Sequence, residues 1–352
     1  MAMGSDCIHS AIVRLSEACI TRRDKDVSTR PASNAANQHC LYSTSTEHAL
    51  CLVLEEVRSF VTNVSETWTH TERGDLALFR SLSKHAFDDN IESTVYWMFL
   101  RLGSHLPQKE SIRIAFANMT IDLGNALASN TPITVPLPME ALPNLSVLSR
   151  SVNTYERVSN YAHTILWLCG KALKLYHLDT IPQPSSASHD RVQDWLQIFE
   201  EVAHWYHLRP QEFHSVVEID KDDANFNPDG EFPTLLFTNG AASLCNQIYH
   251  TAMLTLLQCR PRTIPLGKLH SLPLSPLWHA QRICGIAINN DLPECWDPCL
   301  LASFLAAARH MTHESQQGEI LQAYYRIRNI TGWDIGEHLT QIREYWTFLE
   351  GN

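Results

Sequence analysis

The sequence predicts an all-α protein, an irregular multi-helix domain with no significant sheet, and three observations support this prediction. From residue 46 onward, apolar residues recur at helical spacing. The alternation of apolar and polar residues that marks a half-buried strand is almost absent. Clusters of Pro, Gly, Asn, Asp and Ser separate the apolar runs, at 130–144, 180–190, 220–233 and 260–276. No repeat of 20–50 residues occurs, which disfavours a regular solenoid.

Each expected helix is recognised by an apolar stripe. In 47–61 the stripe includes Ala49, Leu52 and Phe60, and the stripe in 191–209 ends before Pro210. The segment 275–290 opens with a strong helix-start signal, because Ser275 is a good N-cap and a Pro follows at the first helical position. The remaining expected helices cover 92–106, 157–178, 239–258, 298–311, 314–329 and 336–350.

The first 45 residues differ from the rest of the chain. They are rich in Ser, Thr, Asn and Arg and lack long apolar periodicity, apart from one weak helical pattern over 7–20. We therefore expect a flexible N-terminal arm over 1–45, with at most one short helix. A single all-α domain is expected over 46–352.

Composition excludes several classes of function. The 352 residues carry 27 Lys and Arg against 38 Asp and Glu, a formal net charge of -11, which disfavours direct nucleic-acid binding. No run approaches the roughly 20 consecutive apolar residues of a membrane span, and no secretory signal is visible. The ten cysteines are scattered and fit small buried hydrophobic side chains in a reducing compartment. We expect a cytoplasmic protein without membrane partners, or a nuclear one if it is a regulator.

The sequence offers no convincing metal site and no cofactor motif. Glu200, His204 and His207 lie at i, i+4 and i+7 of one helix, but no second Glu-x-x-His accompanies them, and flanking the core is the simpler interpretation. Cys295 and Cys299 have no matching second pair. No G-x-S-x-G, phosphate loop or dinucleotide fingerprint occurs among only 13 glycines. We predict no metal and no cofactor.

Polar side chains inside apolar helices are the most suggestive pattern. A buried Arg, Asn or His needs partners, and such side chains could converge on a ligand cavity. The structural alternative is that each one caps a neighbouring helix or bonds to a loop carbonyl. The pairs at i, i+4 are Trp97 with Arg101, Asn246 with His250, and Trp278 with Arg282.

The order of several motifs resembles the C-terminal regulatory domain of fungal zinc-cluster transcription factors. The motifs are "TVYWMFLRLGSHL", W-x9-W-x3-RP-x2-F beginning at Trp195, Q-x-YH ending at His250, the HA-x2-ICG helix beginning at His279, and "GWDIGEHLTQIREYW". They are specific in combination and in order, and the resemblance covers roughly 46–352. It implies an all-α fold and a fungal source.

This chain departs from that family at the DNA-binding module. Those factors carry six Cys that begin as C-x2-C, followed by a basic linker, whereas no C-x2-C occurs here and the N-terminal cysteines are Cys7, Cys19, Cys40 and Cys51. The residues that would hold two zinc ions and contact DNA are therefore missing. A regulator that acts without DNA contact, by dimerising with a full-length factor or by sensing a metabolite, is one expectation. A homodimer and a structural scaffold are also compatible with such a domain.

The second expectation is an enzyme of fungal secondary metabolism. The chain is similar in length and character to the hetero-Diels–Alderases that join a tropolone quinone methide to the terpene humulene. That similarity implies hydrophobic small-molecule substrates, a tropolone and a terpene, and no cofactor. From side-chain type and helical phase, we predict catalytic hydrogen-bond donors at His250, His279 and Arg282. The predicted substrate-binding residues are Trp97, Arg101, Asn246, Trp278, Tyr324, Tyr325 and Trp346.

Overall fold

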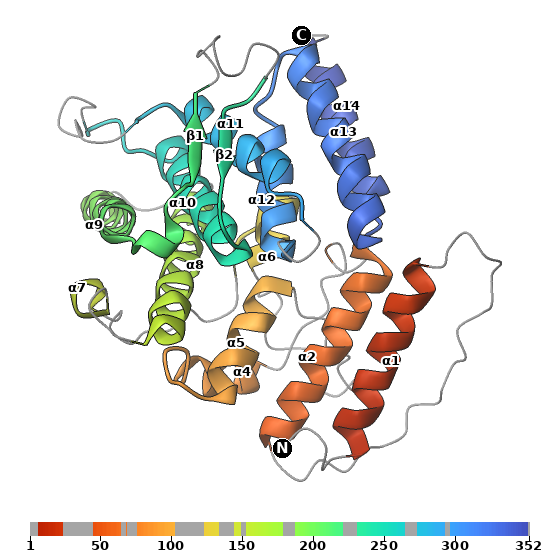
Figure 1. Ribbon diagram of the computed structural model, residues 1–352. Helices are drawn as coiled ribbons and strands as arrows, with labels where there is room; N and C mark the ends of the chain where they lie inside the picture. Colours follow the sequence, from red (N-terminus) through yellow and green to blue (C-terminus); the bar gives the residue numbers. More distant parts are fainter. Residues whose placement is uncertain are drawn as a thin grey trace.

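The structure is a computed structural model, and it describes residues 6–23, 45–64, 68, 76–102, 123–133, 144–148, 153–178, 187–220, 231–264, 273–292 and 296–350. The regular elements among these residues are helices apart from one small strand pair (Figure 1). The first helices are α1 (Asp6–Arg23), α2 (Ser45–Thr62), α4 (Leu76–Ser83), α5 (Ile91–Leu102), α6 (Leu123–Ser129) and α7 (Leu145–Leu148). They are followed by α8 (Thr154–Leu178), α9 (Ala187–Leu208), α10 (Gly240–Gln258), α11 (Pro276–Asn289), α12 (Pro298–Ala308), α13 (Glu314–Thr331) and α14 (Gly336–Glu350). The all-α prediction is confirmed.

Helix α10 is the centre of the packing. It contains no Asp, Glu, Lys or Arg, and every residue from Ala242 to Leu257 is buried. It packs against α8, α9, α11 and α12, so neighbours cover all of its faces, as expected for a helix that is apolar all round. The Asn239 side chain accepts the Ala242 N–H at 2.8 Å and fixes where the helix begins.

Capping residues set the starts of the next two helices. Ser275 accepts the Trp278 N–H at the start of α11, with Pro276 as first residue, as the sequence predicted. The Asp297 side chain accepts the Cys299 N–H at 2.8 Å at the start of α12. Helices α13 and α14 are drawn along one edge of the molecule (Figure 1), and the Tyr325 hydroxyl of α13 accepts a hydrogen bond from Arg343 of α14. Gly332 ends α13 in the left-handed conformation that favours glycine, at φ 72°.

A short antiparallel pair, β1 (Val217–Ile219) and β2 (Thr234–Leu236), lies against α11. Glu218 pairs with Leu235 in the register. The close approach requires Gly285, because a Cβ at that position would lie 2.2 Å from the Pro233 carbonyl oxygen. The sequence did not predict these two strands, because three residues are too few to show an alternation of apolar and polar side chains.

Helix α1 packs along α2 at the opposite end of the molecule from the strand pair (Figure 1). Its buried residues Ile8 and Ala11 face α2, and Arg14 forms an ion pair with Glu55. The helix extends beyond the 7–20 expected from the sequence, and the remainder of the predicted arm, 24–44, lies outside the described residues.

Within the described part of the chain, no helix combines the length and the apolar character needed to cross a membrane. The cysteines in that part are free thiols, and Cys169, Cys245 and Cys284 are buried among apolar side chains.

Candidate functional site

The structure brings the three predicted catalytic side chains to one place, at the contact between α10 and α11. His250 and His279 meet with their Nδ1 atoms 2.9 Å apart, and His279 Nε2 lies 3.0 Å from the Pro273 carbonyl oxygen. Because that carbonyl can only accept, His279 Nε2 carries the proton and its Nδ1 accepts from His250. Burial lowers the pKa of both histidines, that of His279 to about 4, so the pair is neutral.

Arg282 completes this cluster by joining α11 to strand β1. Its Nη1 lies 2.6 Å from Glu218 Oε1 and its Nη2 lies 2.9 Å from Asp220 Oδ1. The guanidinium also lies over the Trp278 ring, 4.2 Å from its centroid. Only Nε of this side chain lacks a hydrogen-bond partner. A buried cation is thus neutralised by two carboxylates, which is how structural arginines are stabilised.

The cluster has the features of a structural core. His279 is fully buried and Arg282 is only 4% exposed. Asn246, one turn before His250, donates to the Phe213 and Ala242 carbonyl oxygens at 2.7 and 2.9 Å. The hydrogen bonds described for these groups end on one another, on backbone carbonyls, or on the carboxylates of Glu218 in β1 and of Asp220 directly after it. This arrangement favours the structural alternative for the predicted catalytic residues.

The aromatic residues predicted to bind substrate are spread over α5, α11, α13 and α14. The Trp97 indole donates to the Ala86 carbonyl oxygen at 2.6 Å, and the ring stacks on His163 at 4.5 Å. The Trp346 indole donates to the Ala308 carbonyl oxygen at 3.0 Å. These tryptophans are buried core residues with satisfied indole groups, because helical phase places a ring on a face without saying which neighbour that face meets.

The two predicted tyrosines and Arg101 also lie apart from the histidines. Tyr324 is buried and stacks on Phe304 at 4.5 Å, whereas Tyr325 is exposed and accepts from Arg343 at 2.9 Å. Arg101 Nη1 lies 3.5 Å from Asp297 Oδ2, between α5 and the start of α12.

Two adjoining cavities lie elsewhere, on either side of Arg309, directly after α12. The larger, which we call the large chamber, has a volume of about 460 Å³ and lies between α6, α8, α10, α12 and α14. This volume is in the range of small-molecule sites. Its apolar side chains include Leu127, Leu173 and Leu254. Its polar lining residues are Ser129, Asn130, Tyr176, Thr251, Thr255, Gln258, Arg309, His310 and Tyr345.

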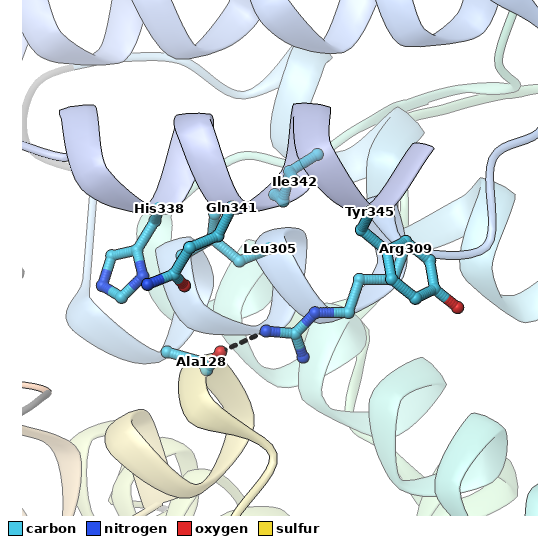
Figure 2. Close-up of a pocket in the computed structure, with 7 residues that line it drawn as sticks. All are labelled: Ala128, Leu305, Arg309, His338, Gln341, Ile342 and Tyr345. Atoms are coloured by element: carbon cyan, nitrogen blue, oxygen red, sulfur yellow. Dashed lines mark hydrogen bonds between the residues drawn. The ribbon is translucent and has the colours of Figure 1, made fainter. Parts of the chain in front are cut away.

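The second cavity, the small chamber, has a volume of about 120 Å³. His338, Gln341 and Tyr345 extend from α14 on one side, and Arg309 and Ala128 approach from below (Figure 2). Arg309 and Tyr345 line both chambers, so the guanidinium stands at the boundary between them.

Arg309 differs from Arg282 in its partners. Its Nη2 donates to the Ala128 carbonyl oxygen near the C-terminal end of α6, as the dashed line in Figure 2 marks. None of the described carboxylates forms an ion pair with it. Burial lowers the pKa of Arg309 below that of a free arginine, but a guanidinium stays protonated at neutral pH.

The imidazoles beside Arg309 are neutral. Burial and the charge of Arg309 lower the pKa of His310, whose Nε2 lies 2.9 Å from Gln258 Nε2. Burial also lowers the pKa of His338. Among the described lining residues, the chambers therefore carry one positive charge, that of Arg309, and this field favours an anionic or acidic ligand.

Sequence reasoning missed this site. The available signal was Arg309 itself, which ends the apolar segment 298–308 and has no Asp or Glu three or four residues away on either side. Among the described residues, no group of three His, Cys, Asp or Glu side chains is placed to hold a metal, and Cys295 lies outside them.

Comparisons with protein-family models, with curated proteins and with solved structures found no match.

Proposed function

We propose that this chain is a cofactor-independent enzyme of secondary metabolism, of the pericyclase type, with its substrate site in the large chamber. The proposed substrates are a hydroxylated tropolone and a humulene-type terpene. The reaction is loss of water from the tropolone to give a quinone methide, followed by hetero-Diels–Alder addition to an alkene of the terpene.

One observation carries the proposal: Arg309 faces a ligand-sized chamber and has no carboxylate partner among the described residues. A tropolone is an acidic ring with a carbonyl and a hydroxyl oxygen on neighbouring carbons. The planar fork of a guanidinium matches such an oxygen pair and supplies the opposite charge. Among acidic ligands, a tropolone is suggested by the similarity of the chain in length and character to the hetero-Diels–Alderases.

The lining groups suit the reaction. The hydroxyl of the arm leaves as water with the proton of the ring hydroxyl, and electron density moves from that ring oxygen towards the arm. It returns to the same oxygen as the alkene adds to the quinone methide, and the Arg309 cation stabilises the charge that develops there. The cycloaddition needs little covalent help, so holding the two partners together supplies most of the acceleration. Leu127, Leu173 and Leu254 offer an apolar surface to the terpene. Gln258 and Tyr345 are exposed, which places the entrance of the chamber at their side.

The test is turnover by the purified protein with a hydroxymethyl-tropolone and humulene, with adduct measured against the uncatalysed background. We expect adduct above background, and we expect Arg309→Met to reduce the rate about 100-fold, because a charge-assisted bidentate contact is lost. Arg326→Met is the matched control, since Arg326 forms an exposed pair with Asp291. No adduct above background with the unaltered chain contradicts the proposal.

A metabolite-sensing regulator is the second candidate, and the neutral imidazoles favour it. The pKa values of His310 and His338 are both lowered, so both rings are unprotonated at neutral pH. Neither ring is therefore a ready general acid for the leaving hydroxyl. This candidate predicts tropolone binding that depends on Arg309 without turnover. Calorimetric titration with tropolone, followed by product analysis of the same sample, separates the two functions.

A further inference from the structure

His310 directly follows Arg309 and lines the large chamber together with it. The imidazole is half-buried, and burial and the charge of Arg309 both lower the pKa of His310. An anion bound at Arg309 removes the second of these causes, because its charge offsets that of the guanidinium. The affinity of the His310 ring for a proton is therefore tied to the occupancy of the chamber.

The hydrogen-bond partner of His310 suits both protonation states of the ring. His310 Nε2 lies 2.9 Å from Gln258 Nε2, so the amide nitrogen donates and the neutral ring accepts at Nε2. In the protonated ring Nε2 donates, and the Gln258 amide has only to turn over for its oxygen to accept. Because Gln258 is exposed, its amide has room for this turn.

The buried histidine pair between α10 and α11 lacks this property. His279 Nε2 faces the Pro273 carbonyl oxygen, and its Nδ1 faces His250 Nδ1. A proton added at His279 Nδ1 would point at the N–H of His250, and neither ring is among the described lining residues of the two chambers. A ligand in the large chamber therefore acts on His310 and not on this pair.

The other lining groups of the large chamber keep their charge near neutral pH. The titratable lining residues from α8 and α14 are Tyr176 and Tyr345, whose phenols are uncharged in this range, and the lining residues from α6 and α10 are not titratable. Arg309 stays protonated throughout. Among the described lining residues, His310 is thus the group whose charge can change between pH 5 and pH 8.

We propose that His310 takes up a proton from the solvent when an acidic ligand binds at Arg309, and that the imidazolium then donates a second charged hydrogen bond to that ligand. Nδ1 makes this contact, since Nε2 faces Gln258. This inference rests on the proposed function, because it takes the acidic ligand to lie in the large chamber. For a ligand that is already an anion, binding becomes tighter as the pH falls, since the complex holds more protons than the free chain.

Calorimetric titration with tropolone at pH 7, repeated in buffers with different enthalpies of ionisation, counts the protons that the complex takes up or releases. The unaltered chain should take up about half a proton more per ligand than His310→Gln, which keeps a hydrogen-bonding side chain but cannot titrate. The difference between the two proteins cancels the proton that tropolone itself loses, because that proton is lost in both titrations.

Two further variants keep the result interpretable. His313→Gln is the matched control and should behave like the unaltered chain, since His313 is exposed at the start of α13 and is not a described lining residue of either chamber. Gln258→Leu replaces His310→Gln in the comparison if that variant does not fold. It removes the amide that accepts from the protonated ring, so proton uptake should fall in this variant as well.

Equal proton uptake by the unaltered chain and by His310→Gln overturns the inference, while the proposed function stands because tropolone still binds. A loss of uptake in His313→Gln as large as that in His310→Gln also overturns it, since the effect would not belong to the chamber. If the unaltered chain does not bind tropolone, the proposed function fails together with this inference.

Discussion

Arg282 in α11 and Arg309 at the end of α12 have opposite surroundings. Arg282 lies inside α11, is buried, and pairs with Glu218 and Asp220. Arg309 directly follows α12, is partly buried, and meets one backbone carbonyl and two cavities. The difference teaches that a buried arginine with its own carboxylates is part of the scaffold. An arginine that faces a cavity without such partners has its charge available to a ligand.

The largest expected effect tests the structural side of this comparison. Arg282→Met should lower the free energy of unfolding by about 3 kcal/mol, because it leaves two carboxylates without their cation and removes the contact with Trp278. Urea unfolding monitored by circular dichroism measures the change. The matched control is Arg326→Met, whose exposed pair with Asp291 should be worth under about 1 kcal/mol. A loss of unfolding free energy as small as that of the control would show that Arg282 does not stabilise the fold.

The second largest effect is expected from acid, which should lower the stability of the fold through the buried pair His250 and His279. In the fold the pKa of His279 is about 4, compared with 6.5 in the unfolded chain, so the unfolded state binds more protons between these values. The free energy of unfolding is therefore highest above pH 6.5 and decreases as the pH drops towards 4. At pH 5 the loss due to His279 should be about 2 kcal/mol. His250 acts in the same direction.

Unfolding by urea at pH 7.5 and at pH 5 checks the sign and the size of this effect. His279→Gln keeps a hydrogen-bonding side chain but cannot titrate, so its stability should change less between the two pH values. An identical pH dependence in the variant would show that other groups cause it.

Arg309→Met should have a smaller effect on folding. It removes the hydrogen bond to Ala128, worth about 1 kcal/mol, but it also relieves a charge that has no carboxylate partner in the described part of the chain. We expect a change in unfolding free energy of about 1 kcal/mol or less, together with the large loss of tropolone-dependent activity. A destabilisation as large as that of Arg282→Met would show that Arg309, like Arg282, mainly stabilises the fold.

The smallest effect concerns the ring over Arg282. Trp278→Phe keeps an aromatic face but a weaker one, so the loss in unfolding free energy should be about 0.5 kcal/mol. The double variant with Arg282→Met measures the coupling. If the two losses simply add, the contact between ring and guanidinium contributes nothing to stability.

The sequence predicted the helices well because a helix needs only local information, namely apolar periodicity and capping residues such as Ser275. It also grouped His250, His279 and Arg282, since all three lie on the inward faces of adjacent helices. What it could not supply was the partner of each polar group. Glu218 lies 64 residues from Arg282, in a strand with no periodic signature, and Asp220 directly follows that strand.

Arg309 was overlooked for the complementary reason. Its significance depends on an absence of partners in three dimensions, and no local pattern encodes that absence.

The backbone contact at Gly285 has a consequence for how this protein can change over evolutionary time. The Pro233 carbonyl oxygen occupies the space of any side chain at that position, whereas a Cβ at Gly318 meets nothing within 4 Å. Variation at Gly318 is free to accumulate, but variation at Gly285 must be accompanied by displacement of the strand pair that carries Glu218. A lineage that diversifies its ligands can therefore remodel the chambers around Arg309 while this junction stays fixed.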